Sequence, residues 1–341
     1  NIANGVYAVV SGGRSNTASN AHSSVSSGEL NNASGPFAHV SSGQVNAASD
    51  PFTFVGSGQW DTASAAFAAV VGGQFNKASG AFSFIGSGNR NLASRAFTTV
   101  SGGDRDTASG DMGTVGGGRL NVITATGVFG TIAGGENNRV TQTWGTVGGG
   151  KNNVSSGTWS VVGGGDTNLA SGTWSVVSGG EADSAIGSWS AIGGGRLNKT
   201  IGAWASIGGG LNNVADSLSA IPGGQSLKLG GNSFGFNADT TNPTTVTDLS
   251  ADAFRSSAYF GNADVLIGNI DNNARDLRFY EPNTSFTYTG TNYTAFQAQT
   301  QTGNITYTLP ASAAASNGDI LTSTTGGVMS WADADSIVTA N

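Results

Sequence analysis

An aliphatic residue returns at a fixed interval through the first two thirds of the chain. The steps between these residues are 15 long, apart from one step of 17 and a last step of 14. The set is Val10, Val25, Val40, Val55, Val70, Ile85, Val100, Val115, Ile132, Val147, Val162, Val177, Ile192, Ile207 and Ile221. We call these residues the anchors. So short and regular a period indicates a repeat architecture with one structural unit per repeat.

Other positions of the repeat are also restricted in character. Three residues before the anchor stands a large side chain, and this set is Tyr7, His22, Phe37, Phe52, Phe67, Phe82, Phe97, Met112, Phe129, Trp144, Trp159, Trp174, Trp189, Trp204 and Leu218. Glycine pairs such as Gly72-Gly73 follow the anchor, as expected where a tight corner needs positive φ. Six residues after the anchor is Asn or Asp, with Asn16, Asn31, Asn76, Asn91, Asn153, Asn168 and Asn198 as typical members. Asx residues form corners because they tolerate the left-handed region and bond nearby backbone.

These positions predict a strand, a glycine corner, an Asx corner, a second short strand and a return. A 15-residue unit cannot bury its own apolar side, so neighbouring units must stack to form a continuous core. Glycine density and β-branched anchors exclude a helix. We therefore expect an all-β chain with a parallel β-solenoid of about 14 turns. Its domains would be residues 1–224 (repeats), 225–250 (cap and linker) and 251–341 (a small β domain).

Composition limits the classes of function. The 341 residues include 55 Gly and no Cys, and only 10% are charged, with a net charge of −7. Scattered basic residues argue against a nucleic-acid partner, and no apolar run reaches the length of a membrane span. A disulfide scaffold and thiolate metal sites are excluded. The start at Asn1 is expected for a mature product or a fragment.

Four residues after the anchor the side chain is polar in nearly every turn, so we expect it to face water. Its charges run Asp104, Arg119, Glu136, Lys151, Asp166, Glu181 and Arg196, mostly alternating in sign. Stacked turns would place these side chains directly opposite one another as cross-strand pairs. Their expected role is to set the register, against the alternative that they only aid solubility.

Two motifs resemble a known family. Asn76-Lys-Ala-Ser-Gly80 with Ser83-Phe-Ile-Gly-Ser-Gly88, and Asn168-Leu-Ala-Ser-Gly172 with Ser175-Val-Val-Ser-Gly-Gly180, are similar to the head repeats of YadA-like trimeric autotransporter adhesins. The resemblance covers about residues 5–224. It implies a left-handed parallel β-roll, a homotrimer and an extracellular location. Similar repeats also occur in phage fibres and other secreted fibres.

The last third reads differently. Residues 230–236 are expected to close the stack, and the polar residues 238–250 to form a linker or exposed loop. Short runs at 258–260, 264–270, 276–280, 285–289, 293–298 and 304–309 predict a small antiparallel β module. The segment from Thr308 to Trp331 resembles parts of phage tail fibres and secreted fibres that often precede a self-cleaving chaperone. A C-terminus produced by such cleavage is therefore a hypothesis.

The aromatic set is the foremost candidate site. Phe37, Phe52, Phe67, Phe82, Phe97, Phe129, Trp144, Trp159, Trp174, Trp189 and Trp204 could form a platform for sugars. The alternative, which we favour, is that this position faces the interior or a subunit interface, because Phe lacks the polar N–H of Trp.

Catalytic and metal chemistry has little support. The Asx residues are mostly neutral, which suits corners better than Ca²⁺. Two carboxylate pairs, Asp104/Asp106 and Glu181/Asp183, could share one side of a strand, but a glycosidase needs them in a cleft. Only His22 and His39 are histidines, too few for a three-histidine zinc site. We expect no cofactor and no enzymatic activity.

The sequence thus favours an extracellular fibre protein of a cell surface or a phage tail. It would self-associate, and it would function in adhesion or receptor binding. Its partner would be a host surface glycan or a protein receptor. The alternative is a subunit of an end-to-end polymerising extracellular filament. A glycan-degrading tailspike is a third, weaker interpretation. An ice-binding face is set aside because no regular Thr-Xaa-Thr array is present.

Overall fold

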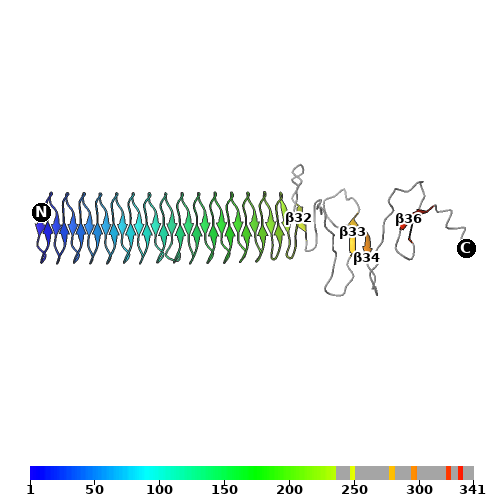
Figure 1. Ribbon diagram of the computed structural model, residues 1–341, viewed down its shortest axis with the longest axis horizontal. Helices are drawn as coiled ribbons and strands as arrows, with labels where there is room; N and C mark the ends of the chain where they lie inside the picture. The colour runs from blue at the N-terminus through cyan, green and yellow to red at the C-terminus, as the bar shows by residue number, and fades with distance from the viewer. Residues whose placement is uncertain (236–245, 250–275, 281–292, 298–319, 324–328, 333–341) are drawn as a thin grey trace. The chain divides into compact units, whose positions relative to one another are not determined.

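The computed structural model describes residues 1–235, 246–249, 276–280, 293–297, 320–323 and 329–332. Contacts divide the chain into two compact units, Asn1–Ser257 and Ala258–Asn341. In the described residues the regular structure is entirely β-strand, and the first unit is a parallel β-solenoid (Figure 1). The predicted all-β solenoid is therefore confirmed. The described part contains no helix with the length and apolarity that a membrane crossing needs.

The anchors build one of the two long sheets. All fifteen anchors are the last residues of two-residue strands, and the strands of successive turns pair in parallel. The strands are β2 (Val9–Val10), β4 (Ser24–Val25), β6 (His39–Val40), β8 (Phe54–Val55), β10 (Ala69–Val70), β12 (Phe84–Ile85), β14 (Thr99–Val100), β16 (Thr114–Val115), β18 (Thr131–Ile132), β20 (Thr146–Val147), β22 (Val161–Val162), β24 (Val176–Val177), β26 (Ala191–Ile192), β28 (Ser206–Ile207) and β30 (Ala220–Ile221). The register holds across the long turn, where Val115 still pairs with Ile132.

The second sheet has seventeen strands and runs beside the first. They are β1 (Ile2–Ala3), β3 (Thr17–Ala18), β5 (Asn32–Ala33), β7 (Ala47–Ala48), β9 (Thr62–Ala63), β11 (Lys77–Ala78), β13 (Leu92–Ala93), β15 (Thr107–Ala108), β17 (Val122–Ile123), β19 (Arg139–Val140), β21 (Val154–Ser155), β23 (Leu169–Ala170), β25 (Ser184–Ala185), β27 (Lys199–Thr200), β29 (Val214–Ala215), β31 (Leu227–Leu229) and β32 (Val246–Leu249). A third column of single parallel bridges joins successive turns between the sheets, from Arg14 to Gln225.

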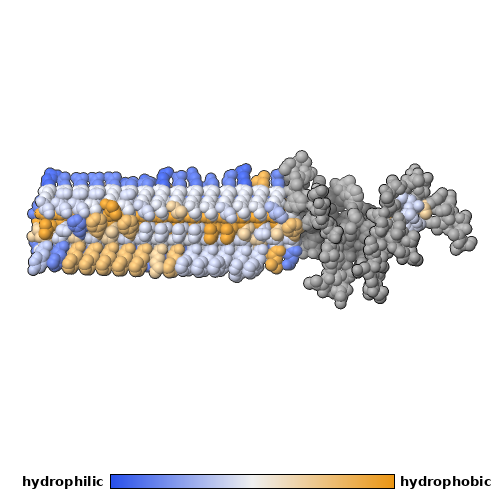
Figure 2. All heavy atoms as spheres, in the orientation of Figure 1, coloured by the Kyte–Doolittle hydropathy of each residue, from blue (hydrophilic) through white to orange (hydrophobic). Residues whose placement is uncertain are grey.

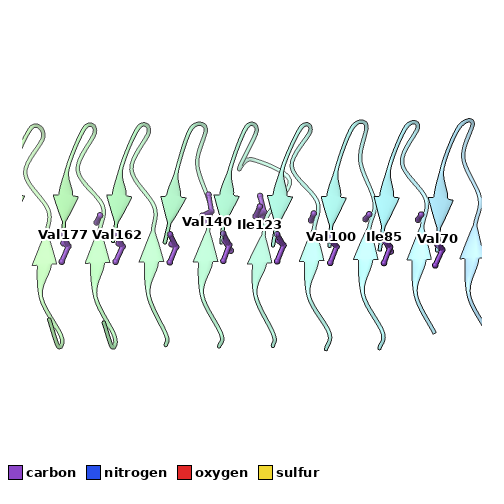
Figure 3. Close-up of a cluster of buried hydrophobic side chains, with 14 of the residues drawn as sticks. Val70, Ile85, Val100, Ile123, Val140, Val162 and Val177 are labelled. Carbon is purple, nitrogen blue, oxygen red and sulfur yellow. The ribbon is translucent and has the colours of Figure 1, made fainter. Parts of the chain in front are cut away.

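The core is a single row of small and medium side chains between the two sheets. Fourteen of the anchors are at most 1% exposed, and Val10 in the first turn is partly buried. The residue eight after each anchor, usually Ala, faces them from the second sheet and is also buried. Figure 3 shows such side chains stacked turn by turn, among them Val70, Ile85 and Val100. Stacking thus buries the apolar side that one turn could not bury alone.

A glycine corner follows every anchor. The glycine three residues after the anchor has φ between 80° and 121° in all fifteen turns, as expected for a left-handed corner. The next residue donates its N–H to the corner glycine of the following turn, as Arg14 does to Gly28 at 2.9 Å. The backbones of successive turns are therefore very close here.

Core volumes compensate one another near the middle of the solenoid. Where Val140 replaces the usual Ala of the second sheet, the inward residue of the first sheet is Gly145 rather than Ser, Thr or Ala. A Cβ at Gly145 would lie 2.7 Å from Val140 Cγ1 and 2.7 Å from Ser155 Oγ. The larger Val140 is thus accommodated by a glycine that faces it, as close packing requires.

Gly145→Ala is expected to lower the free energy of unfolding by about 1–3 kcal/mol through overpacking. Combining it with Val140→Ala should cost less than the sum of the two single changes, because removal of the valine methyl groups makes room. Chemical denaturation of the two single variants and the double variant measures this coupling. Strict additivity would contradict the proposed compensation.

Beyond the last anchor the second sheet continues. Strand β32 pairs in parallel with β31, with Leu227 opposite Val246. Part of the segment 238–250, expected to be a linker or loop, is therefore a strand, and that expectation is wrong for residues 246–249. Within the closing segment, Phe234 forms a parallel bridge with Ala220 at the end of the first sheet.

The second unit contains two antiparallel pairs among its described residues. β33 (Asp276–Tyr280) pairs with β34 (Tyr293–Gln297), and β35 (Ile320–Ser323) pairs with β36 (Met329–Ala332). The first pair confirms the antiparallel strands predicted at 276–280 and 293–298. The predicted runs at 258–260, 264–270, 285–289 and 304–309 lie outside the described residues.

Candidate functional site

The large residues before the anchors form one exposed column along the solenoid, which we call the aromatic ladder. Its members occupy the left-handed region, with φ from 55° to 62°. Most of its members are between 38% exposed (Trp159) and 56% exposed (Trp204), while Tyr7 at 76% and Leu218 at 61% are more exposed and Phe129 is less exposed. The expectation that this position faces the interior is therefore wrong for the single chain. The next residue along the chain points inward, so at this corner the ring points outward.

Rings of the aromatic ladder stack face to face in three runs, from Tyr7 to Phe97, from Phe129 to Trp174 and from Trp189 to Trp204. Phe37 and Phe52 have centroids 4.9 Å apart with an interplanar angle of 5°, and Trp159 and Trp174 are 4.8 Å apart at 1°. His22 joins the stack between Tyr7 and Phe37. Each stacked pair covers the ring faces that a sugar would need. A sugar platform, the interpretation that we did not favour, would therefore have no open faces between stacked members.

The aromatic ladder borders a surface without charge. In each of the fifteen turns, the seven residues from the ladder position to the corner glycine contain no Asp, Glu, Lys or Arg. We call the outward-facing part of these segments the uncharged flank. Figure 2 shows rows of side chains along the solenoid, with a hydrophilic row at one margin and a row at the other margin that changes from apolar to weakly hydrophilic part-way along. The absence of charge from these seven positions can be seen in the sequence. It is missed when each position of the repeat is considered separately.

The residues four after the anchors lie in a row of single bridges between the sheets, on the charged side of the turn. Arg119 contacts Glu136 at 3.0 Å and Asp104 at 3.9 Å, while Lys151 lies 3.8 Å from Glu136. Arg196 contacts Glu181 at 3.5 Å, and Arg14 pairs with Glu29. Among the described residues no ion pair joins Lys151 to Asp166, whose Oδ1 accepts a hydrogen bond from Thr167 at 2.8 Å.

Where the residue of this row is uncharged, hydrogen bonds between side-chain amides take the place of ion pairs. Gln59 donates to Gln44 at 2.7 Å, and Gln74 donates to Gln59 at 2.8 Å. Because these pairs lie at the surface and are at least partly exposed, each contributes little to stability. Their geometry fits a role in register, since a slip would separate every pair at once.

The Asx residues form a buried column inside the solenoid. Asn168 donates from Nδ2 to the carbonyls of Gly164 and Gly180, both at 2.9 Å, and its Oδ1 accepts from the N–H of Asp183 at 2.9 Å. Asn16, Asn31, Asn76, Asn91, Asn153 and Asn198 repeat this pattern. They do not adopt the expected left-handed conformation, which falls on the preceding residue, such as Thr167. Their side chains stabilise the corners through hydrogen bonds to backbone groups inside the solenoid.

The candidate catalytic groups are not brought together. Asp104 is on the outside and contacts Arg119, whereas Asp106 is fully buried, so the two carboxylates do not share one side. Glu181 and Asp183 are separated in the same way. His39 bonds Ser24 Oγ through Nδ1 at 2.7 Å and Ser41 Oγ through Nε2 at 2.9 Å, and burial lowers its pKa. Both ring nitrogens are thus occupied by serines. The described residues contain no group of three or more His, Cys, Asp or Glu that could hold a metal ion.

Comparison with protein-family models finds none that matches the chain, and comparison with curated proteins finds no match either.

Proposed function

We propose that the protein is a non-enzymatic extracellular fibre protein. In this proposal the solenoid is a rigid shaft or head that self-associates along the uncharged flank, as a homotrimer. It holds surfaces for adhesion or receptor binding away from a cell or a virion. The observation that carries the proposal is the aromatic ladder, whose members are mostly about half exposed along the length of the solenoid. Contiguous exposed apolar surface of this extent marks an interaction site rather than a solvated face.

The charge distribution supports a partner on this flank. Every charged residue of the fifteen turns falls outside the seven-residue segments of the flank, although those segments make up nearly half of each turn. Interface cores are depleted of charge because a desolvated ion is costly. A face that only met water would need no such exclusion.

The axial spacing points to a second copy of this chain. Stacked ladder rings lie 4.0–5.0 Å apart, close to the distance between neighbouring strands of a β-sheet. A partner that contacts every turn must share this repeat. A parallel copy of this chain has the same axial repeat. In a closed oligomer with rotational symmetry, the uncharged flank of every chain would then contact a neighbouring chain.

Glycines on the flank support the same proposal. From Gly102 to Gly223 the residue two after the anchor is Gly in every turn, yet Ser27, Ser42 and Ser57 occupy the same position earlier. A Cβ at Gly164 or Gly179 would meet nothing within 4 Å. At Gly164 and Gly179 the fold of the single chain therefore does not require glycine, whereas the close approach of another chain would.

The test is the mass of the purified full chain, by light scattering with negative-stain microscopy. A homotrimer of 33.9 kDa chains is expected as a rod of about 100 kDa. Two matched variants locate the interface, because Val161 on β22 and Val154 on β21 are both half-buried strand residues that point outward. Val161→Lys, on the flank, should dissociate the trimer, since symmetry places like charges together. Val154→Lys should leave it intact, because its column already holds Lys77, Arg139 and Lys199.

Three outcomes would count against the proposal. A monomeric wild-type chain would overturn self-association. A trimer that withstands Val161→Lys as well as it withstands Val154→Lys would place the interface elsewhere. Long filaments in which solenoids join end to end would favour the polymerising structural filament.

A further inference from the structure

Three members of the buried Asx column are acids. Asp61, Asp106 and Asp183 occupy the position that is Asn in the other turns except the last, which has Leu227, and each is fully buried. In all three, Oδ1 does what the Asn oxygen does and accepts the N–H of the next column member. The distances are 2.8 Å to Asn76, 2.8 Å to Asn121 and 2.7 Å to Asn198.

The second carboxyl oxygen stands where asparagine has its donor. A Cβ built at Gly165 would lie 2.6 Å from Asn168 Nδ2 and 2.2 Å from the carbonyl oxygen of Gly180. At the equivalent Gly180, the same Cβ would lie 2.3 Å from Asp183 Oδ2 and 2.5 Å from the carbonyl oxygen of Gly195. Oδ2 thus replaces Nδ2 beside the same backbone carbonyl. In all three acids Oδ2 is buried without a hydrogen-bond partner.

An ionised carboxylate does not suit this place. It can only accept hydrogen bonds, and the neighbouring carbonyl can only accept as well. Two acceptor oxygens would then face each other away from water, which is costly for a neutral group and more so for a charge. A protonated carboxyl has the one hydrogen that is missing, and Oδ2–H can donate it to the carbonyl.

We propose that Asp61, Asp106 and Asp183 are proton-binding sites of the solenoid, each holding a proton on Oδ2 that is donated to a backbone carbonyl, so that the shaft is more stable when they are protonated. The ligand is the proton itself, and the sites are separated along the shaft by turns that carry Asn.

Among the described residues no salt bridge joins a cation to any of the three acids. Above and below each acid in the column are neutral Asn residues, and the inward side chains of the facing sheet are neutral. The charged groups near the three acids are Asp104 and Arg105 beside Asp106, Glu181 beside Asp183, and the exposed Lys77 and Lys199 one turn on from Asp61 and Asp183. Of these, Asp104 raises the pKa of Asp106 further.

Burial shifts the three acids in the expected direction. It raises the pKa of Asp61 to about 6, against an opposing effect of the Asn76 hydrogen bonds, and it also raises the pKa of Asp106 and Asp183. A carboxyl whose pKa is higher in the folded than in the unfolded chain contributes stability fully below the unfolded value of 3.8. For Asp61 that contribution is lost as the pH rises through about 6.

The experiment compares the full wild-type chain with Asp61→Asn across pH. Asn restores the donor found in the neighbouring turns, so the folding equilibrium constant at pH 7.5 should rise by roughly tenfold to a hundredfold. At pH 4 the gain should nearly vanish. The reverse change, Asn91→Asp, should destabilise at pH 7.5 and much less at pH 4. Asp166→Asn on the surface is the control for charge and should show neither effect.

Infrared spectroscopy of the triple variant Asp61→Asn, Asp106→Asn, Asp183→Asn gives a direct measurement. At pH 5 the wild-type chain should show the carbonyl band of protonated carboxyl groups, with the intensity of three groups missing in the triple variant. Equal gains for Asp61→Asn at pH 4 and pH 7.5 would overturn the proposal. An unchanged carboxyl band in the triple variant would overturn it as well.

Discussion

Gly165→Ala is expected to destabilise the solenoid by about 2–5 kcal/mol, while Gly164→Ala, one residue earlier, is expected to change stability by less than about 0.5 kcal/mol. Gly165 is a corner glycine with φ of 89°. A Cβ there would lie 2.2 Å from the carbonyl oxygen of Gly180 and 2.8 Å from its nitrogen. Backbone atoms of the next turn cannot yield as a flexible side chain could, so left-handed strain and overlap add together.

Gly164 is the matched control because it lies in the same corner and has open space around it. Both variants should be measured by thermal and chemical denaturation under conditions that keep the chain monomeric. Equal losses of stability in the two variants would mean that the corner tolerates no side chain at either position. That result would contradict the open space found around Gly164. A loss for Gly164→Ala that appears only in the assembled protein would locate a subunit contact at this residue.

Asn168→Ala is expected to lower the free energy of unfolding by about 2–4 kcal/mol. The change removes both bonds from Nδ2 to Gly164 and Gly180 and leaves the buried N–H of Asp183 without its acceptor. An unpaired buried donor costs more than the net value of a hydrogen bond. Urea denaturation of the variant measures the loss.

The control for this column is Thr167→Ala. Thr167 precedes Asn168, is exposed, and adopts a φ of 61°, while Ala182 stands at the equivalent place one turn later with a φ of 57°. This variant should stay within about 0.5 kcal/mol of the wild type. If Asn168→Ala cost no more than Thr167→Ala, the buried amide column would have no structural role.

The fold was predictable because its determinants are local and repeat. Each of the fifteen anchors ends a strand of the first sheet, and the 17-residue step between Val115 and Ile132 keeps the register. Sequence position also predicted the charge row, where Arg119 contacts acids on both sides. The Asp166 exception shows the limit, because a nearby hydroxyl competes with the cation for the carboxylate.

Side-chain direction at the corners was harder to predict. An aromatic residue such as Trp174 is normally evidence of burial, but here a backbone φ of 61° turns it outward. Likewise Asn is normally evidence of an exposed turn, yet Asn168 is 1% exposed because its amide completes the backbone bonds of two turns. Spacing alone does not distinguish these cases, since both depend on which neighbouring residue takes the left-handed conformation.

The constant register has a hereditary consequence. Every strand pairs with a strand one repeat away, and each column of the solenoid holds residues of similar character in most turns. Unequal recombination between neighbouring repeats in the gene would therefore add or delete whole turns and leave each junction looking like the others. The length of the solenoid could then change in evolution through the number of repeats, while the packing between neighbouring turns stays the same.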